Sequence, residues 1–222
     1  MIIELYGLTG SGKTYLSKKL EESGFFCIKF DSKVSKYLTS LSFIFSHPIL
    51  SAFLLSKINR FSNRSTKLLP IKKRLKLLLV RSILLLATMS SYKKALRYRG
   101  AVILDEGFFQ IIHSIFEDEI EEEIIKNLID KIPKPEILVI VDSTKKSREE
   151  RFNQKGYPRR DEFGSKYFFD WYKVMESNDL KIRKILSNNN YNILIHEFDI
   201  PKSYSKALNK LISLINKKGK ND

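Results

Sequence analysis

The sequence Gly-Leu-Thr-Gly-Ser-Gly-Lys-Thr at residues 7–14 decides the fold of this 222-residue chain. It satisfies the pattern Gly-x-x-x-x-Gly-Lys-[Ser/Thr], in which a glycine-rich backbone turns its N–H groups towards a phosphate. The apolar residues 2–6 before it are typical of a buried strand, and apolar residues at helical spacing follow at 13–22. A strand, a glycine-rich loop and a helix in this order predict a nucleoside-triphosphate-binding loop.

Each residue type in this loop suits a task in triphosphate binding. The residues that we expect to contact the nucleotide are Tyr6, Gly7, Thr9, Gly10, Ser11, Gly12, Lys13 and Thr14. Lys13 is expected to reach the β- and γ-phosphate oxygens and to act in catalysis, and the Thr14 hydroxyl to ligate Mg²⁺. The positive end of the following helix adds to the attraction for phosphate. The sequence therefore predicts ATP and Mg²⁺ as cofactors.

Carboxylates follow two further predicted strands, at the edge where α/β sheets place their sites. The apolar run 102–104 ends in Asp105 and Glu106, of which we expect Asp105 to bind the metal and one of the two to face the acceptor. Asp31 follows the predicted strand at 25–30, and it is either a catalytic base for the acceptor hydroxyl or a cap of the next helix. The sequence does not decide which of these three carboxylates is the base.

Apolar runs alternate with helical patterns along the whole chain. Strands are expected at residues 2–6, 25–30, 101–104, 137–141 and 192–198. This alternation is typical of a parallel sheet with helices on both faces. The prediction is a single α/β domain over residues 1–222, a P-loop three-layer sandwich whose five-stranded parallel sheet has the spatial order 2-3-1-4-5.

The segment 32–100, between the second and third predicted strands, accounts for the whole net positive charge of the chain, because the basic and acidic residues outside it balance. No Asp or Glu occurs from Ser32 to Leu104, where 15 Lys and Arg residues lie, and the net charge of the chain is +15. We expect a large helical insertion that covers the acceptor. Its charge favours an anionic acceptor, such as a nucleotide or a sugar phosphate, or a lipid-linked acceptor presented at an anionic membrane.

The same insertion has two other possible environments, single-stranded nucleic acid and the membrane. Single-stranded nucleic acid is a weaker candidate, because Tyr37, Tyr92 and Tyr98 could stack on bases but no nucleic-acid motif accompanies them. The apolar runs 38–55 and 75–89 are interrupted by a His-Pro pair and by two basic residues, so we expect packed helices in place of membrane spans. No signal-peptide pattern opens the chain, and we expect a cytoplasmic protein, with peripheral contact at the inner face of the membrane as an option.

The most specific pattern outside the loop lies at residues 142–162, which read Asp-Ser-Thr-Lys-Lys-Ser-Arg-Glu-Glu-Arg-Phe-Asn-Gln-Lys-Gly-Tyr-Pro-Arg-Arg-Asp-Glu. Basic residues cluster there beside a glycine-containing turn: Arg148, Arg151, Lys155, Arg159 and Arg160. A hinged turn would carry these donors onto a triphosphate. A solvated basic helix is the alternative interpretation.

This stretch resembles thymidylate kinases. The matching positions are Asp142, Glu150, Arg151, Lys155, Gly156, Arg160 and Glu162. The resemblance covers residues 1–31 and 101–200 and implies a mobile lid at 143–165. It implies that Arg148, Arg151 and Lys155 bind the nucleotide, and that Arg151 and Arg160 stabilise charge during catalysis.

The resemblance implies an ATP-dependent kinase of the nucleoside and nucleotide kinase group, but it does not extend to the insertion, so thymidylate is not implied as the acceptor. Residues 105–110, Asp-Glu-Gly-Phe-Phe-Gln, also resemble thymidylate-kinase-like proteins encoded among bacterial surface-polysaccharide genes. The alternative function is a P-loop NTPase that hydrolyses nucleotide as a switch or binds nucleic acid. The oligomeric state stays open, with a homodimer as one option.

Overall fold

The structure is a computed structural model. It describes residues 1–29, 33–46, 48–49, 51–52, 56, 71–116, 118–155, 164–188, 191, 193–199 and 204–219. Of the residues singled out above, Asp31, Gly156, Arg159, Arg160 and Glu162 lie outside the described residues.

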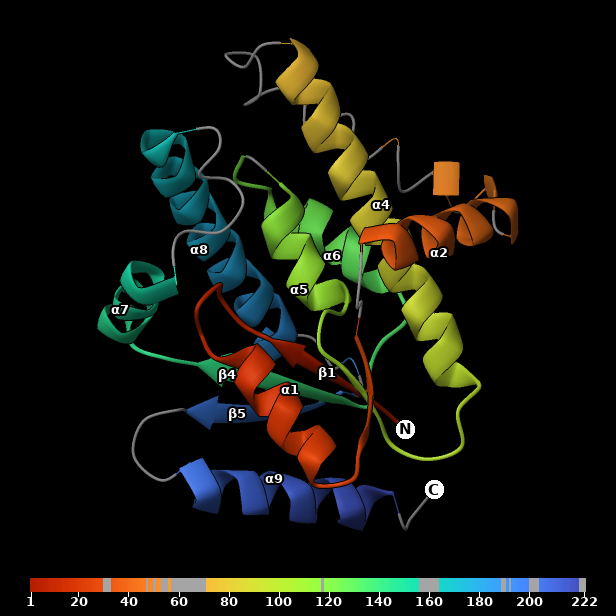
Figure 1. Cartoon of the computed structure of the whole chain (residues 1–222), viewed down its shortest axis with the longest axis vertical. Helices are drawn as coiled ribbons and strands as arrows, with labels where there is room; N and C mark the ends of the chain where they lie inside the picture. Colours follow the sequence, from red (N-terminus) through yellow and green to blue (C-terminus); the bar gives the residue numbers. More distant parts are fainter. Residues whose placement is uncertain are drawn as a thin grey trace.

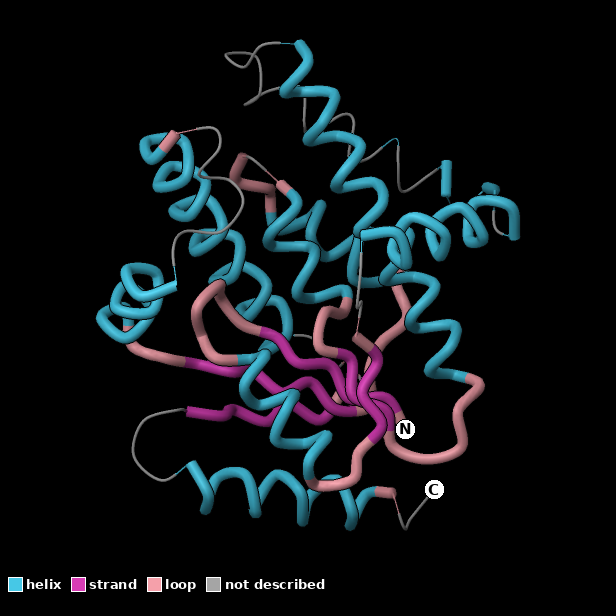
Figure 2. Tube along the Cα trace, viewed as in Figure 1, coloured by secondary structure: helices cyan, strands magenta, loops and turns pink. Residues whose placement is uncertain are grey.

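A five-stranded parallel sheet forms the centre of the molecule (Figures 1 and 2). Its strands are β1 (Ile2–Tyr6), β2 (Phe26–Ile28), β3 (Val102–Leu104), β4 (Ile137–Asp142) and β5 (Leu194–Asp199). The spatial order is β2-β3-β1-β4-β5, so β1 lies in the middle, with Ile3 beside Ile103 of β3 and Ile137 of β4. This confirms the predicted fold class and strand order.

Helices cover both faces of this sheet (Figure 1). They are α1 (Lys13–Glu22), α2 (Lys33–Ser46), α4 (Ile71–Leu96), α5 (Phe108–Ile115), α6 (Glu122–Lys131), α7 (Lys145–Lys155), α8 (Ser165–Asn188) and α9 (Tyr204–Lys218). Side chains of α1 and α9 pack in one apolar cluster with Ile3 and Leu5, whereas α4, α5, α6 and α8 pack in another with Ile2 and Tyr6. Alternate residues of β1 thus face opposite layers, as the pleat of a strand requires.

The described part of the chain between β2 and β3 is mainly helical, as predicted. Helix α2 lies across α4, where the Ser40 hydroxyl donates to the Ile83 carbonyl over 2.8 Å and Phe43 is buried (Figure 1). The second half of α4 belongs to the core, through Leu85, Met89 and Tyr92.

Helix α4 is the one described helix that is long and apolar enough to cross a membrane, with a mean hydropathy of 1.5 over 18 residues. Half of that window is buried inside the protein, which is also typical of a core helix. The sequence led us to expect a packed helix here, and its second half is packed.

Candidate active site

The loop between β1 and α1 is bent at three glycines. Gly7, Gly10 and Gly12 have φ angles of 153°, 83° and 106°, in the region that side chains avoid and glycine tolerates. At Gly7 a Cβ atom would lie only 2.3 Å from the carbonyl oxygen of Val141 on β4. Gly12 is the N-cap of α1, so the loop leads directly into a helix N-terminus. This is the backbone arrangement in which N–H groups surround a phosphate.

The Lys13 side chain folds back over this loop. Its Nζ donates to the carbonyl oxygens of Gly7 at 2.7 Å and Leu8 at 3.0 Å. Burial lowers the pKa of Lys13 to about 8, and the negative charges of Asp105 and Glu106 act against that lowering. The ammonium group therefore lies within the curve of the loop and within electrostatic reach of both carboxylates at the end of β3.

Asp105 and Glu106 follow the carboxyl end of β3, which pairs directly with β1. Asp105 is half-buried and Glu106 is exposed. The sheet thus brings both predicted carboxylates to the same edge as the glycine-rich loop. The position of Asp31, the third candidate base, lies outside the described residues.

The predicted metal ligands were Thr14 and Asp105. Thr14 is exposed in the first turn of α1, and Asp105 ends the strand beside the loop. Within the described part of the chain, no three His, Cys, Asp or Glu side chains form a metal cluster. Mg²⁺ needs none, because it binds through one or two protein oxygens together with substrate phosphates and waters. A hydroxyl and a carboxylate are the hard oxygen donors that fit this ion.

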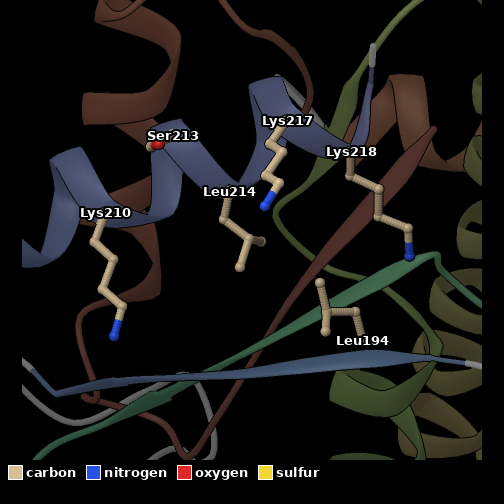
Figure 3. A pocket seen from close by; sticks show the side chains of 6 residues that line it. All are labelled: Leu194, Lys210, Ser213, Leu214, Lys217 and Lys218. Atoms are coloured by element: carbon tan, nitrogen blue, oxygen red, sulfur yellow. The ribbon is translucent and has the colours of Figure 1, made fainter. Parts of the chain in front are cut away.

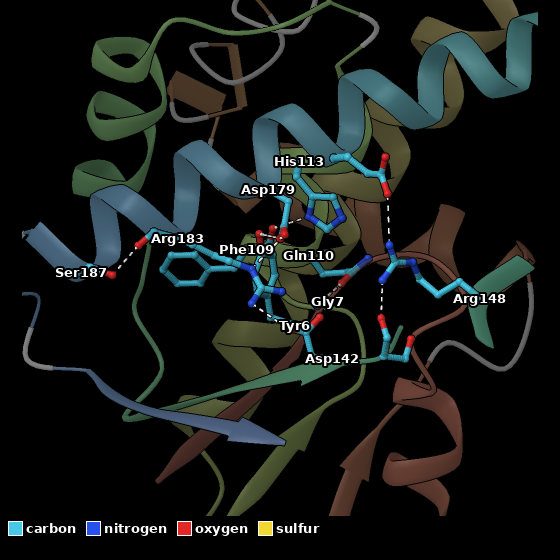
Figure 4. Close-up of polar contacts among 12 residues, drawn as sticks. Tyr6, Gly7, Phe109, Gln110, His113, Asp142, Arg148, Asp179, Arg183 and Ser187 are labelled. Atoms are coloured by element: carbon cyan, nitrogen blue, oxygen red, sulfur yellow. Dashed lines mark hydrogen bonds and ion pairs between the residues drawn. The ribbon is translucent and has the colours of Figure 1, made fainter. Parts of the chain in front are cut away.

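Gln110 of α5 connects this helix to the loop. The Gly7 N–H donates to Gln110 Oε1 over 3.1 Å (Figure 4). Sequence reasoning did not single out Gln110 as a site residue, because no local pattern relates two positions 103 residues apart. Gln110 appeared in the sequence analysis only as the last residue of the stretch 105–110, which was quoted for a family resemblance.

A fully buried carboxylate, Glu4 of β1, binds the start of α5. It accepts hydrogen bonds from the Gln110 N–H at 3.1 Å and from the Tyr92 hydroxyl of α4. Burial raises the pKa of Glu4 to about 7, although these hydrogen bonds act in the opposite direction. A Cβ at Gly107 would lie 2.1 Å from Glu4 Cδ, so any larger residue there would have to displace the Glu4 side chain. Glu4 therefore links the central strand, the insertion and α5.

Tyr6, which the sequence predicted to contact the nucleotide, is completely buried at the end of β1. Its hydroxyl donates to Asp179 of α8, and burial raises its pKa. Arg183 then donates from Nε to Asp179 over 2.9 Å and from Nη1 to Asp142 over 3.0 Å (Figure 4). These contacts join β1, α8 and β4 beneath the loop and give the Tyr6 hydroxyl an internal partner.

His113 lies beside Tyr6 in the same buried layer. The two rings meet edge to face with centroids 5.2 Å apart, and His113 Nδ1 is 3.2 Å from the Phe109 carbonyl oxygen. Burial lowers the pKa of His113 to about 4. A neutral imidazole that packs against an aromatic ring is suited to filling the layer under the loop. No local sequence pattern singles out His113, because Tyr6 lies far from it in the chain.

The predicted nucleotide-binding arginines of α7 differ in their surroundings. Arg151 Nη1 donates to the carbonyl oxygen of Gly10 in the loop. Arg148 is buried and donates to the Tyr172 hydroxyl at 2.8 Å, to Glu176 Oε1 at 3.1 Å and to the Ser143 carbonyl.

The structure therefore brings Arg151 to the glycine-rich loop, while the contacts of Arg148 connect α7 with α8 and the end of β4. The backbone of Lys155 ends α7, and its side chain lies outside the described part. The nucleotide-binding roles of Arg148, Arg151 and Lys155, and the catalytic roles of Arg151 and Arg160, stay predictions.

A separate surface hollow of about 470 Å³ lies between β5 and α9 (Figure 3). Its lining residues are Leu194, Lys210, Ser213, Leu214, Lys217 and Lys218. Leu194 begins β5, so the hollow lies at the amino end of the strands, whereas the loop lies at their carboxyl end. No predicted site residue lines it, and it does not belong to the candidate active site.

No protein-family model matches this sequence, and no curated protein matches it. Solved structures do match its fold. The deoxyadenosine kinase from M. mycoides with the products dCMP and a flexible dCDP bound has a TM-score of 0.52 at 13% identity, covering 98% of this chain and 100% of that chain. The same enzyme with bound dATP also has a TM-score of 0.52, at 12% identity, covering 97% and 100% of the two chains.

The thymidylate kinase from Candida albicans has a TM-score of 0.54 at 15% identity, covering 98% of this chain and 91% of that chain. The chain thus has the P-loop fold of nucleoside and nucleotide kinases. Nothing in these comparisons supports the narrower resemblance at residues 105–110 to proteins encoded among surface-polysaccharide genes.

Proposed function

We propose that the chain is an ATP-dependent phosphotransferase that moves the γ-phosphoryl group of ATP to a small anionic acceptor. The observation that carries the proposal is the arrangement around Lys13, whose ammonium group lies in the glycine-rich loop and interacts with the charges of Asp105 and Glu106. The fold shared with nucleoside and nucleotide kinases supports it.

The phosphates of ATP are assigned to the loop and to two cations beside it. Lys13 would exchange its bonds to the Gly7 and Leu8 carbonyls for the β- and γ-phosphate oxygens. Arg151, which donates to the Gly10 carbonyl in the loop, would meet the transferred group. Because charge builds up on that group during transfer, cations held beside it lower the barrier.

Thr14 and Asp105 are assigned to Mg²⁺, which would neutralise phosphate charge when bound.

In the transfer step an acceptor oxygen forms a bond to the γ-phosphorus, and the bond from that phosphorus to the β–γ bridging oxygen breaks, which releases ADP. If the acceptor oxygen belongs to a hydroxyl, its proton passes to one of the three candidate carboxylates, Asp31, Asp105 or Glu106. If it belongs to an ionised phosphate, no base is needed.

Nucleosides and nucleotides are the first acceptors to test. The two deoxyadenosine kinase structures of the same fold hold dCMP and dCDP, or dATP. The acid-free, basic stretch from Ser32 to Leu104 favours a phosphorylated acceptor over a neutral one, because a neutral nucleoside or sugar would gain nothing from that charge.

The test is an ADP-release assay with ATP and Mg²⁺ against matched pairs of nucleosides, nucleoside monophosphates, sugars and sugar phosphates. We expect ADP release to depend on one phosphorylated acceptor and to fall to background in Lys13→Ala. Lys18→Ala, an exposed lysine later in the same helix, is the matched control and should retain activity. ADP release at an equal rate without any acceptor would support the alternative, a nucleotide-hydrolysing switch.

A further inference from the structure

The first half of α4 exposes large apolar side chains to solvent. Ile71, Leu75, Leu79 and Val80 are 71%, 62%, 54% and 52% exposed. Ile71, Leu75 and Leu79 are spaced four residues apart, so they form one stripe along the helix, which we call the α4 stripe. Isolated apolar residues on a surface are ordinary, but an exposed row of them marks an interaction site.

Lysines accompany the α4 stripe on the same half of the helix. Lys72, Lys73 and Lys76 are exposed. Lys72 and Lys76 each come one position after a stripe residue, which places them about 100° further around the helix axis. No Asp or Glu occurs in α4, nor anywhere from Ser32 to Leu104. The exposed face is therefore apolar along one line and positively charged along the next.

The second half of the helix anchors it in the protein. Leu85, Leu86, Met89 and Ala95 belong to the core, and the Tyr92 hydroxyl donates to the buried Glu4 carboxylate. Figure 1 shows the first half of α4 extending away from the sheet, beyond the crossing with α2. Because a spanning orientation would pull the second half out of this core, the arrangement suits a helix that lies on a membrane surface and does not cross it.

Helix α2, which crosses α4, also exposes apolar side chains. Leu38, Leu41 and Phe45 are exposed, the last by 84%, and Ile49 beyond the helix is exposed by 86%. Ser40 and Phe43, on the other side of α2, are buried against the protein. The two helices of the insertion thus expose apolar residues within a segment that carries no acid.

We propose that the α4 stripe and its lysines bind the surface of an anionic phospholipid membrane. Helices with an apolar stripe beside lysines insert into the boundary between headgroups and acyl chains, and anionic headgroups attract the lysines. A second copy of the chain fits less well. A symmetric contact would place lysine against lysine, and no acid of this segment offsets the repulsion. This inference goes beyond the proposed function, and its test does not depend on turnover.

The test is co-sedimentation of the full chain with vesicles of phosphatidylcholine, with and without phosphatidylglycerol. We expect binding that requires phosphatidylglycerol and weakens from about 0.1 M to about 1 M salt, over which the screening length falls from about 10 Å to about 3 Å. The triple variant Lys72→Gln, Lys73→Gln, Lys76→Gln should bind at least about tenfold more weakly.

Two controls separate the position of these residues from simple charge and hydrophobicity. The variant Lys206→Gln, Lys210→Gln, Lys217→Gln removes the same charge from exposed positions of α9, on the other side of the sheet, and should bind vesicles like the parent. Leu75→Ser with Leu79→Ser should weaken binding, whereas Leu96→Ser with Leu180→Ser, also exposed, should not.

Absence of vesicle binding by the parent would overturn the proposal. So would equal loss of binding in the α4 and α9 lysine variants, because the effect would then be one of net charge alone. Sedimentation equilibrium can give a third result against the proposal. If the parent is a dimer and the variant Leu75→Ser with Leu79→Ser is a monomer, the α4 stripe binds a second copy of the chain. A chain without kinase activity would still give a result in each of these three experiments, because none of them measures turnover.

Discussion

The Gly7 N–H and the Gln110 side-chain carbonyl are joined by a 3.1 Å hydrogen bond that connects the first glycine of the loop to helix α5. Gln110 is itself held in place by the central strand, because its own N–H donates to the buried Glu4 carboxylate of β1. The geometry of the loop thus depends on a helix that lies 103 residues further along the chain.

Replacing Gln110 should therefore disturb both stability and nucleotide binding. Gln110→Ala leaves the buried Gly7 N–H without its acceptor, and we expect a loss of about 1–3 kcal/mol in the free energy of unfolding. Gln110→Glu keeps an acceptor oxygen but adds a negative charge beside the phosphate site, so it should weaken ATP binding more than it lowers stability. Urea unfolding and ATP titration measure the two effects. Unchanged values for both variants would show that the bond has no such role.

Glu4 should make the stability of the protein depend on pH. Burial raises its pKa from the usual 4.5 to about 7 in the folded state. The folded protein therefore holds this proton more tightly than the unfolded chain, so the contribution of Glu4 to stability is greatest below about pH 4.5 and is lost as the pH rises through about 7. The full effect is on the order of 3 kcal/mol.

Glu4→Gln, which cannot ionise, isolates this contribution. As the pH rises from 5 to 8, the parent should lose stability relative to Glu4→Gln. The other titrating groups are the same in both proteins, so their effects cancel in the difference of the two unfolding free energies. Urea unfolding at several pH values within this window measures it. A difference that stays constant over the window would mean that Glu4 does not titrate there.

Lys13 should make ATP affinity depend on pH. Its pKa in the free protein is lowered to about 8 by burial, so its positive charge is present below that pH and is lost as the pH rises through it. ATP affinity of the parent should therefore decline above about pH 8, and Lys13→Ala should bind ATP more weakly without this decline. Isothermal titration at pH 7 and pH 9 measures the effect. Parallel pH profiles for the two proteins would contradict the assignment.

Loss of Arg151 should lower the rate of transfer more than it weakens ATP binding. Arg151→Ala removes a cation beside the loop, and we expect kcat to fall by about 100-fold with a smaller change in ATP affinity, since the cation acts on charge that develops in the transition state. Arg160→Ala is expected to behave in the same way on the basis of the sequence alone. Equal losses in kcat and in ATP affinity would instead indicate ground-state binding.

Arg148→Ala is the structural counterpart. It removes three bonds that join α7 to α8 and β4, and it leaves Glu176 and Tyr172 without that partner. The melting temperature should therefore fall in Arg148→Ala and stay near the parent value in Arg151→Ala. Thermal unfolding of the two variants side by side measures this contrast, and the reverse order of melting temperatures would refute it.

The fold could be predicted because its determinants are local. The loop at residues 7–14 and the apolar runs around it specify β1, α1 and the alternation of strands and helices, and the order β2-β3-β1-β4-β5 followed. Boundaries were less accurate: the strand expected at 25–30 is β2 at Phe26–Ile28. A short edge strand depends on pairing with its neighbour, here β3, which no local pattern reports.

The site was predictable only where side chains lie in or beside the loop or at a strand end. Lys13, Asp105 and Arg151 meet near one edge of the sheet. The supports of the loop were missed, because the pairs Tyr92–Glu4 and Tyr6–Asp179 join residues 88 and 173 positions apart. Glu4 gave a warning in the sequence, as a charge within an otherwise apolar strand, yet its partner could be identified only in the folded chain.

The most direct test of the central claim follows the γ-phosphoryl group itself. The chain is incubated with ATP labelled at the γ-phosphate, Mg²⁺ and the phosphorylated acceptors, and the label is traced to product or to inorganic phosphate. Our account predicts label on one acceptor in step with ADP release, in the parent and Lys18→Ala but not in Lys13→Ala. Label that appears only as inorganic phosphate, at a rate indifferent to every acceptor, would contradict it.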